Sequence, residues 1–329
     1  MRIGQIKDAL HAAHKANLSV FLKGSPGTAK TALVRQFADE AGMELVPIHA
    51  PLTDLLDIKG VISTKGDEAR FLPLSMWPKV TDDPVVVLID ELPQCVPAIQ
   101  NAFSQLLIDK KMGDIELPRG SLVIATGNRK EDKAATHNVP SHVVNRVLHI
   151  EVDRSNEDFF SWALANSIEP EIVAFGHFKP ECVYNFDPKD SQNPYATYRS
   201  WEFVSEILKA KPPRELIAEL VAGVVGKGVA AEFLAYRRMY RDLPDPKEIL
   251  AAPTVAAVPT DSGTLYAIST ALASIIDKDN AANYFTYIDR LPTEFGVMSV
   301  KSARSTFPAI VKTKSFGAWA KTNSSVILG

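Results

Sequence analysis

The sequence is poor in cysteine, in net charge and in long apolar runs, and each shortage excludes a class of protein. Two cysteines, Cys95 and Cys182, occur among 329 residues without a CxxC pair, which excludes a disulfide framework and a cysteine-based zinc site. The formal net charge of −3 gives no overall attraction to nucleic acid or to an anionic membrane. No apolar run approaches the ~20 residues that cross a bilayer, and the first residues lack a secretory apolar segment. We therefore expect a cytoplasmic protein.

Motifs for metal binding and for nucleophilic catalysis are also missing. The seven histidines show no HExxH or other metal-ligand spacing, and no Gly-x-Ser-x-Gly elbow occurs. What remains is an ordinary globular composition, 46% hydrophobic and 23% charged, in a chain long enough for two domains. The basic cluster at residues 237–241 is interpreted as a solvated helix face.

A glycine-rich loop between an apolar run and an amphipathic stretch is the strongest positive signal. Residues 18–22 predict a strand, and residues 29–41 predict a helix. Glycines let backbone amides converge on phosphate oxygens, and the helix directs its positive end to the same anion. This order is that of a phosphate-binding P-loop, and its predicted nucleotide-binding residues are Gly24, Ser25, Pro26, Gly27, Thr28, Ala29, Lys30 and Thr31.

Three residues at the end of this loop carry specific expectations. Lys30 is expected to reach the β- and γ-phosphates of ATP, and the Thr31 hydroxyl is expected to ligate Mg²⁺. Ala29 stands where the usual motif has a third glycine. We expect Ala29 to lie in the first helical turn with ordinary helical angles, so that its methyl group is tolerated.

A second motif ends the apolar run at residues 85–89, which is continuous as a buried parallel strand should be. Asp90 and Glu91 follow this run, at the strand end where an open α/β sheet binds its ligands. Asp90 is expected to hold Mg²⁺ through its water shell. Glu91 is expected to orient or activate the attacking water, an effect typically worth ~10²–10⁴ in rate. The alternative is a strand that simply ends in two solvated acids.

Strands and helices alternate up to residue 153, and helices dominate after it. Strands at 18–22, 44–48, 85–89, 122–126 and 147–152, separated by helical segments, predict an α/β P-loop fold with a parallel five-stranded sheet. Later helices are predicted at 157–166, 170–178, 199–208, 214–225, 232–240, 264–276 and 281–288. We therefore predict a nucleotide domain at 1–153 with two hairpin insertions, an α-helical lid at 154–250, and a helical extension of the lid at 251–329.

The P-loop followed by the Asp90-Glu91 strand resembles the AAA+ ATPases, and the Pro-Gly and Ala-Lys-Thr of the loop resemble their MoxR-like branch. This resemblance implies a sensor 1 role for Asn128, which follows the apolar run 122–126 and would hydrogen-bond the γ-phosphate or the lytic water. The plain alternative is a Gly-Asn turn. His49, at the end of the second strand, occupies the place of a polar switch residue in the family, and a partly buried structural histidine is its alternative.

The same resemblance implies roles for two arginines. Arg146 matches the arginine finger, which reaches the γ-phosphate of a neighbouring subunit, with Arg129 and Arg154 as rivals. Arg199 matches sensor 2, which reaches the nucleotide from the lid, although Tyr198 stands where the family often has proline. Residues 54–71, with a turn at Lys65-Gly66-Asp67, and residues 111–118 resemble the helix-2 insert and the pre-sensor hairpin. Two ordinary surface hairpins are the alternative.

The resemblance implies a ring, expected to be a hexamer, that hydrolyses ATP with Mg²⁺ and remodels a protein partner. A protein with a von Willebrand factor A domain is the partner class that the resemblance suggests. One alternative is an AAA+ machine acting on nucleic acid, which the net charge disfavours. Another is a non-hydrolysing nucleotide-binding scaffold, which the intact Lys30, Asp90 and Glu91 disfavour.

Overall fold

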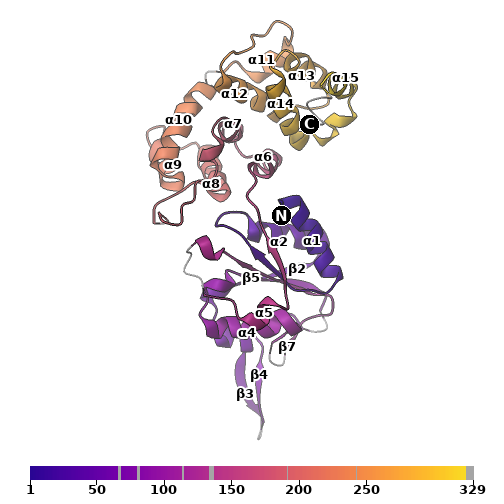
Figure 1. Cartoon of the computed structure of the whole chain (residues 1–329), viewed down its shortest axis with the longest axis vertical. Coiled ribbons are helices and arrows are strands. Elements are labelled where there is room, and N and C mark those ends of the chain that lie inside the picture. The colour runs from indigo at the N-terminus through magenta and orange to yellow at the C-terminus, as the bar shows by residue number, and fades with distance from the viewer. Residues whose placement is uncertain are drawn as a thin grey trace. The chain divides into compact units, whose positions relative to one another are not determined.

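The computed structural model describes residues 1–65, 68–79, 82–112, 115–132, 137–190, 192–241 and 243–323. The chain divides into two compact units (Figure 1). The first comprises Met1–Arg154 with Asp187–Lys189, and the second comprises Ser155–Phe186 with Asp190–Gly329. Each unit is described by itself.

A parallel five-stranded sheet forms the centre of the first unit, which confirms the predicted fold. Its order is β2-β5-β8-β1-β9, and every neighbouring pair in it is parallel. The strand order reverses beside β1, and such a switch point is where open α/β sheets bind ligands. The bounds are β1 Val20–Lys23, β2 Glu44–His49, β5 Val85–Asp90, β8 Leu122–Gly127 and β9 Leu148–Glu151.

Helices cover both faces of this sheet because alternate strand residues point to opposite sides. Leu22, Leu88 and Ile124 pack with the apolar faces of α1 (Ile3–Lys15) and α2 (Lys30–Ala41). Their sequence neighbours on the other face pack with α4 (Pro97–Asp109) and α5 (Ser141–Val144). The carboxyl ends of the strands and the first turn of α2 are thereby held by two buried cores.

Both predicted hairpin insertions are present. The first follows α3 (Leu55–Lys59) and pairs β3 (Val61–Lys65) with β4 (Glu68–Leu72) in antiparallel register. Its strands extend away from the sheet (Figure 1). The second pairs β6 (Lys111–Met112) with β7 (Ile115–Glu116). Gly66 and Asp67 of the predicted turn lie outside the described residues.

The described residues of the second unit form helices joined by loops, without a strand. One core joins α6 to α10, and another joins α11 to α15. None of the helices in the described part of the chain is long and apolar enough to cross a membrane. The bounds are α6 Asn156–Ala165, α7 Pro170–Phe178, α8 Tyr198–Lys209, α9 Ile217–Val225, α10 Lys227–Arg241, α11 Pro246–Ala251, α12 Ser262–Ser274, α13 Ala281–Ile288, α14 Thr293–Thr306 and α15 Lys314–Thr322.

The interpretation of residues 237–241 as a solvated face was wrong for Arg237. Its Nε lies 2.6 Å from Oε1 of Glu171 on α7, and both side chains are more than 90% buried. The helix also begins earlier than predicted, because Gly226 takes a left-handed φ of 84° between α9 and α10 and the second helix starts directly after it. Arg237 therefore faces the core of the second unit, where the carboxylate of Glu171 compensates its charge.

Candidate active site

The predicted P-loop connects β1 to α2 at the switch point of the sheet. Gly24 donates its N–H to the Gly127 carbonyl, 3.2 Å away, and a Cβ at Gly24 would lie 3.1 Å from both the side chain and the carbonyl of Val152. Gly27 has a φ of 69°, which favours glycine. Thr28 donates its hydroxyl to the Ser25 carbonyl at 2.8 Å. The chain thus passes close to the residue that follows β9 at Gly24, and it turns towards the helix at Gly27.

The expectation for Ala29 was wrong. Ala29 has φ 63° and ψ 20°, a left-handed conformation, and stands before the first residue of α2. The helix begins one residue later than predicted because the loop needs a left-handed residue to enter it. A glycine here would avoid the contact between Cβ and the carbonyl that makes this region unfavourable for other residues. The methyl group of Ala29 is therefore accommodated with strain.

Lys30 and Asn128 meet beneath this loop. The Lys30 ammonium group donates to the carbonyls of Gly24 and Ser25, at 2.8 and 3.0 Å, and to Oδ1 of Asn128 at 3.1 Å. Asn128 directly follows β8, which pairs with β1 in the sheet. The register of two adjacent strands thereby places both residues at one edge.

Thr31, Asp90 and Thr126 form a second cluster at the same edge. The Thr31 hydroxyl donates to both carboxylate oxygens of Asp90, at 3.2 and 3.0 Å, and Thr126 donates its hydroxyl to Oδ1 of Asp90. A hydroxyl and a carboxylate are hard oxygen donors, and Mg²⁺ is commonly held by one or two protein oxygens with water and phosphate completing its shell. Thr31 and Asp90 fit such an ion.

Thr126 was not singled out as a functional residue from the sequence. Its side chain is fully buried, and besides its bond to Asp90 it accepts the N–H of Glu91 at 3.2 Å. Its signal was a hydroxyl at the end of an otherwise apolar buried strand, because buried hydroxyls are almost always hydrogen-bonded. Thr126 links the two acids of the second motif.

Glu91 leaves β5 with a φ of 61°, so its side chain departs from the direction that the strand would give it. Oε2 of Glu91 lies 3.7 Å from Nε2 of His49, and His49 pairs with Asp90 in the register of β2 and β5. The His49 and Glu91 side chains are 48% and 39% exposed, so solvent screens their mutual attraction. The carboxylate remains open to an incoming ligand.

Polar contacts also tie the loop to the segment after β8. Ser25 donates its hydroxyl to Asp132 at 3.3 Å, and Asp132 accepts the backbone N–H of Arg129 at 3.1 Å. The Arg129 guanidinium lies 2.8 Å from Glu151. Asp132 is buried and was not predicted. Arg129, a rival for the finger role, is held within its own unit.

Arg146 belongs to the first unit and Arg199 to the second. Arg146 is exposed in the turn between α5 and β9. Its backbone N–H donates to Val143 at 2.9 Å. Arg199 is exposed in the first turn of α8 in the second unit, where Thr197 caps the helix by accepting the Ser200 N–H at 3.2 Å.

Comparison with known proteins agrees with this geometry. Residues 19–142, less than half of the chain, match the family model described as AAA domain, dynein-related subfamily. Midasin from Giardia intestinalis is 26% identical over 155 residues, 45% of this chain and 3% of midasin. The chain therefore spans only a small part of that relative.

The match and the fold support an AAA+ ATPase domain. Neither comparison singles out the MoxR-like branch. Among solved structures, NtrX from Brucella abortus is 14% identical with a TM-score of 0.43, over 92% of this chain and 67% of NtrX. The RuvB Holliday junction branch migration motor from Thermotoga maritima is 17% identical with a TM-score of 0.39, over 88% of this chain and 86% of RuvB.

Proposed function

We propose that this chain is a MoxR-like AAA+ ATPase that hydrolyses ATP to ADP and phosphate in a ring and uses the energy to remodel a protein partner. The observation that carries the proposal is the convergence of Lys30, Thr31, Asp90 and Asn128 at one sheet edge, directly beneath a loop that enters a helix N-terminus. A solvated strand end would not need this set of contacts.

The residues of the loop suggest how the triphosphate is held. Lys30 exchanges its carbonyl partners for oxygens of the β- and γ-phosphates, since a charge-assisted bond is stronger than one to a neutral carbonyl. Backbone amides of the loop and of the first turn of α2 donate to the same phosphates. Asn128, released by Lys30, donates its amide N–H to the γ-phosphate or to the attacking water.

Asp90 and Glu91 have different roles in the proposed hydrolysis. Thr31 and Asp90 would hold a Mg²⁺ ion, which would supply positive charge to the triphosphate. Glu91 accepts a proton from the water as it attacks, and Thr126 fixes the backbone of Glu91 by accepting its N–H. Solvent screens the contact of Glu91 with His49, so we propose that the carboxylate leaves His49 once nucleotide is bound.

Substitution of the two central residues tests the hydrolysis proposal. Glu91→Gln should retain ATP binding and lower the rate of phosphate release by about 10²–10⁴. Lys30→Ala should lose ATP binding, measured by calorimetry. Glu44→Gln, an exposed carboxylate at the opposite end of β2, is the matched control and should leave both unchanged. Near-normal turnover in Glu91→Gln removes Glu91 from the mechanism, and unchanged affinity in Lys30→Ala removes the P-loop assignment.

We propose that Arg146 acts on the nucleotide of a neighbouring subunit, and Arg199 on that of its own. Arg146 is exposed and lies in the turn before the edge strand β9. Such a finger is worth ~10³–10⁵ in kcat in the GTPase precedent. Mixed rings of Arg146→Ala and Glu91→Gln subunits should regain hydrolysis that neither parent shows. No recovery in a mixture shown to co-assemble by native mass spectrometry contradicts the shared site.

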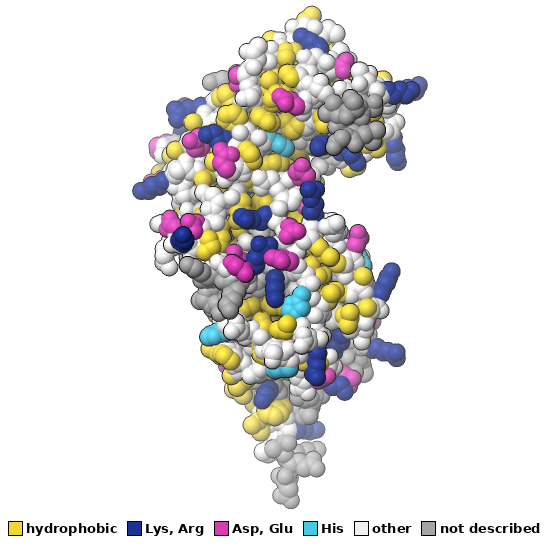
Figure 2. Space-filling view, in the orientation of Figure 1, with side chains coloured by type: hydrophobic (Ala, Val, Ile, Leu, Met, Phe, Trp, Pro, Cys, Tyr) yellow, Lys and Arg dark blue, Asp and Glu magenta, His cyan; other side chains and the backbone are white. Residues whose placement is uncertain are grey.

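The proposal of a protein partner rests on the first hairpin insertion. Val61, Ile62 and Leu72 on its two strands are 52%, 60% and 47% exposed, and Figure 2 shows apolar side chains gathered in this part of the first unit. Clustered exposed apolar residues commonly mark a protein contact. Glu91→Gln rings loaded with ATP should retain a partner in native cells, and adding Ile62→Ser should release it. We also propose that this partner has a von Willebrand factor A domain. The protein would work in a reducing, cytoplasmic compartment.

A further inference from the structure

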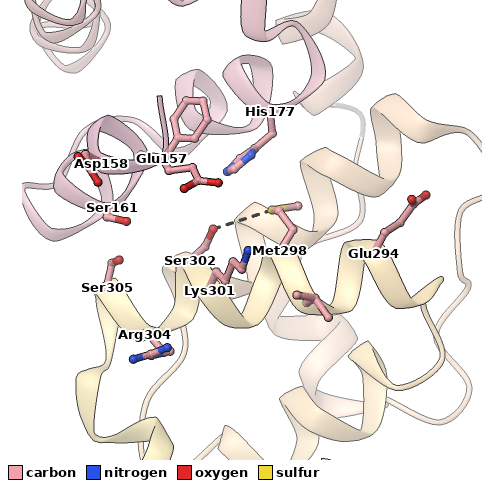
Figure 3. A pocket seen from close by; sticks show the side chains of 12 residues that line it. Glu157, Asp158, Ser161, His177, Glu294, Met298, Lys301, Ser302, Arg304 and Ser305 are labelled. Atoms are coloured by element: carbon pink, nitrogen blue, oxygen red, sulfur yellow. Dashed lines mark hydrogen bonds between the residues drawn. The ribbon is translucent and has the colours of Figure 1, made fainter. Parts of the chain in front are cut away.

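A hollow of about 630 Å³ opens in the second unit, within the size range of ligand pockets. It lies between α6, α7 and α14, and none of the residues proposed for hydrolysis lines it. Glu157, Phe160, His177, Met298, Lys301 and Ser302 are among its lining residues (Figure 3). The proposed hydrolysis of ATP therefore does not account for this hollow.

Charges of both signs face this space. Figure 3 shows the Glu157 carboxylate entering from α6 and the Lys301 ammonium group from α14, with the Ser302 hydroxyl between them. The hydrogen bond drawn there joins Ser302 to the sulfur of Met298 at 3.9 Å, and a thioether is a weak acceptor. Glu157 disfavours a polyanion such as a nucleotide, and Lys301 disfavours a simple cation.

His177 adds a buried polar atom to the same hollow. Its Nε2 is buried without a hydrogen-bond partner in the described structure, and its ring points towards the space between the helices (Figure 3). The imidazole packs 4.2 Å from Phe160 and parallel to Tyr266 at 6.2 Å. Burial lowers the pKa of His177 to about 4, so the ring is neutral at pH 7. Buried polar atoms normally find a partner, and here a ligand can supply it.

We propose that this hollow binds a free amino acid with an apolar side chain. Its ammonium group pairs with Glu157, and its carboxylate pairs with Lys301 and Ser302. The side chain packs against Phe160 and Met298, and a second N–H of the ammonium group donates to His177 Nε2. A molecule that carries both charges and an apolar part fits Glu157, Lys301 and Phe160 together.

Calorimetric titration of the full chain with leucine, methionine and phenylalanine tests the ligand class. Each amino acid is compared with two analogues, the acid that lacks the ammonium group and the amine that lacks the carboxylate. At least one amino acid should bind, and both of its analogues should bind at least about tenfold more weakly, since each loses a charge-assisted contact. Absence of binding by all three at millimolar concentration, or equal binding of an analogue, overturns the proposal.

Variants then locate the site. Glu157→Gln and Lys301→Met should each weaken binding at least about tenfold. Glu206→Gln and Lys209→Met, at an exposed pair with a 2.7 Å contact on α8, are the matched controls and should bind as the unaltered protein does. Equal affinity in the pocket variants and the controls contradicts the placement. If a pocket variant fails to fold, as judged by circular dichroism, the analogue comparison on the unaltered protein still decides.

Discussion

Replacing Ala29 by glycine should stabilise the first unit. Ala29 has φ 63° and ψ 20° directly before α2, where a Cβ costs about 1–2 kcal/mol relative to glycine. Glycine loses part of this advantage because it makes the unfolded chain more flexible, by about 0.4–1 kcal/mol. Loss of a half-buried methyl group removes a few tenths more. The net expectation is a gain of about 0.5 kcal/mol, roughly 1–2 °C in a unit of this size.

The same substitution at Ala32 is the control. Ala32 is exposed inside α2, two residues into the helix, where glycine costs about 0.8–1 kcal/mol relative to alanine. Both variants gain the same freedom in the unfolded chain, so apart from the few tenths of a kcal/mol for the half-buried Ala29 methyl group, their difference reports the backbone angles of the folded state. We expect the two variants to differ by about 1.5 kcal/mol.

Scanning calorimetry of the full chain measures both variants. The transition of the first unit is recognised as the one that ATP with Mg²⁺ shifts upwards, because a ligand that binds the folded state stabilises it. Ala29→Gly should raise this transition, and Ala32→Gly should lower it. Equal destabilisation by both substitutions would refute the argument that the loop strains Ala29.

Three further predictions concern buried polar groups. Thr126→Val should lower kcat by about 10–100-fold with little change in KM, because it leaves the paired acids without a buried partner, and Thr126→Ser should restore turnover. Burial lowers the pKa of His177 from its usual 6.5 to about 4 in the folded protein, so the unfolded chain takes up the proton first as the pH falls. The free energy of unfolding should therefore fall by about 3 kcal/mol between pH 6.5 and pH 4, and His177→Phe should remove this loss in urea titrations. Arg237→Met should cost about 3–5 kcal/mol by leaving the Glu171 charge buried, and adding Glu171→Leu should recover most of it.

The sheet was predictable because buried parallel strands are continuous apolar runs that end in polar residues. Asp90 and Asn128 each follow such a run, and the register of parallel strands brings them to one edge. The α14 helix was missed because residues 293–306 contain glycine, serine and threonine among the apolar positions, which weakens the helical pattern. The pairing of Arg237 with Glu171 joins residues 66 positions apart, and local patterns carry no information about such contacts.

The left-handed angles of Ala29 and Glu91 are the part of the site that local reasoning could not supply. Both residues have φ above 60° although neither is glycine. Ala29 stands directly before α2 and Glu91 directly after β5, so each left-handed residue turns the chain where a regular element begins or ends. Strain of this kind persists only where surrounding contacts hold it. For Glu91 one such contact is visible, since its N–H donates to Thr126 on the neighbouring strand. The direction of the proposed base therefore depends on a hydroxyl from β8, and the two strands must be in register before the carboxylate is placed.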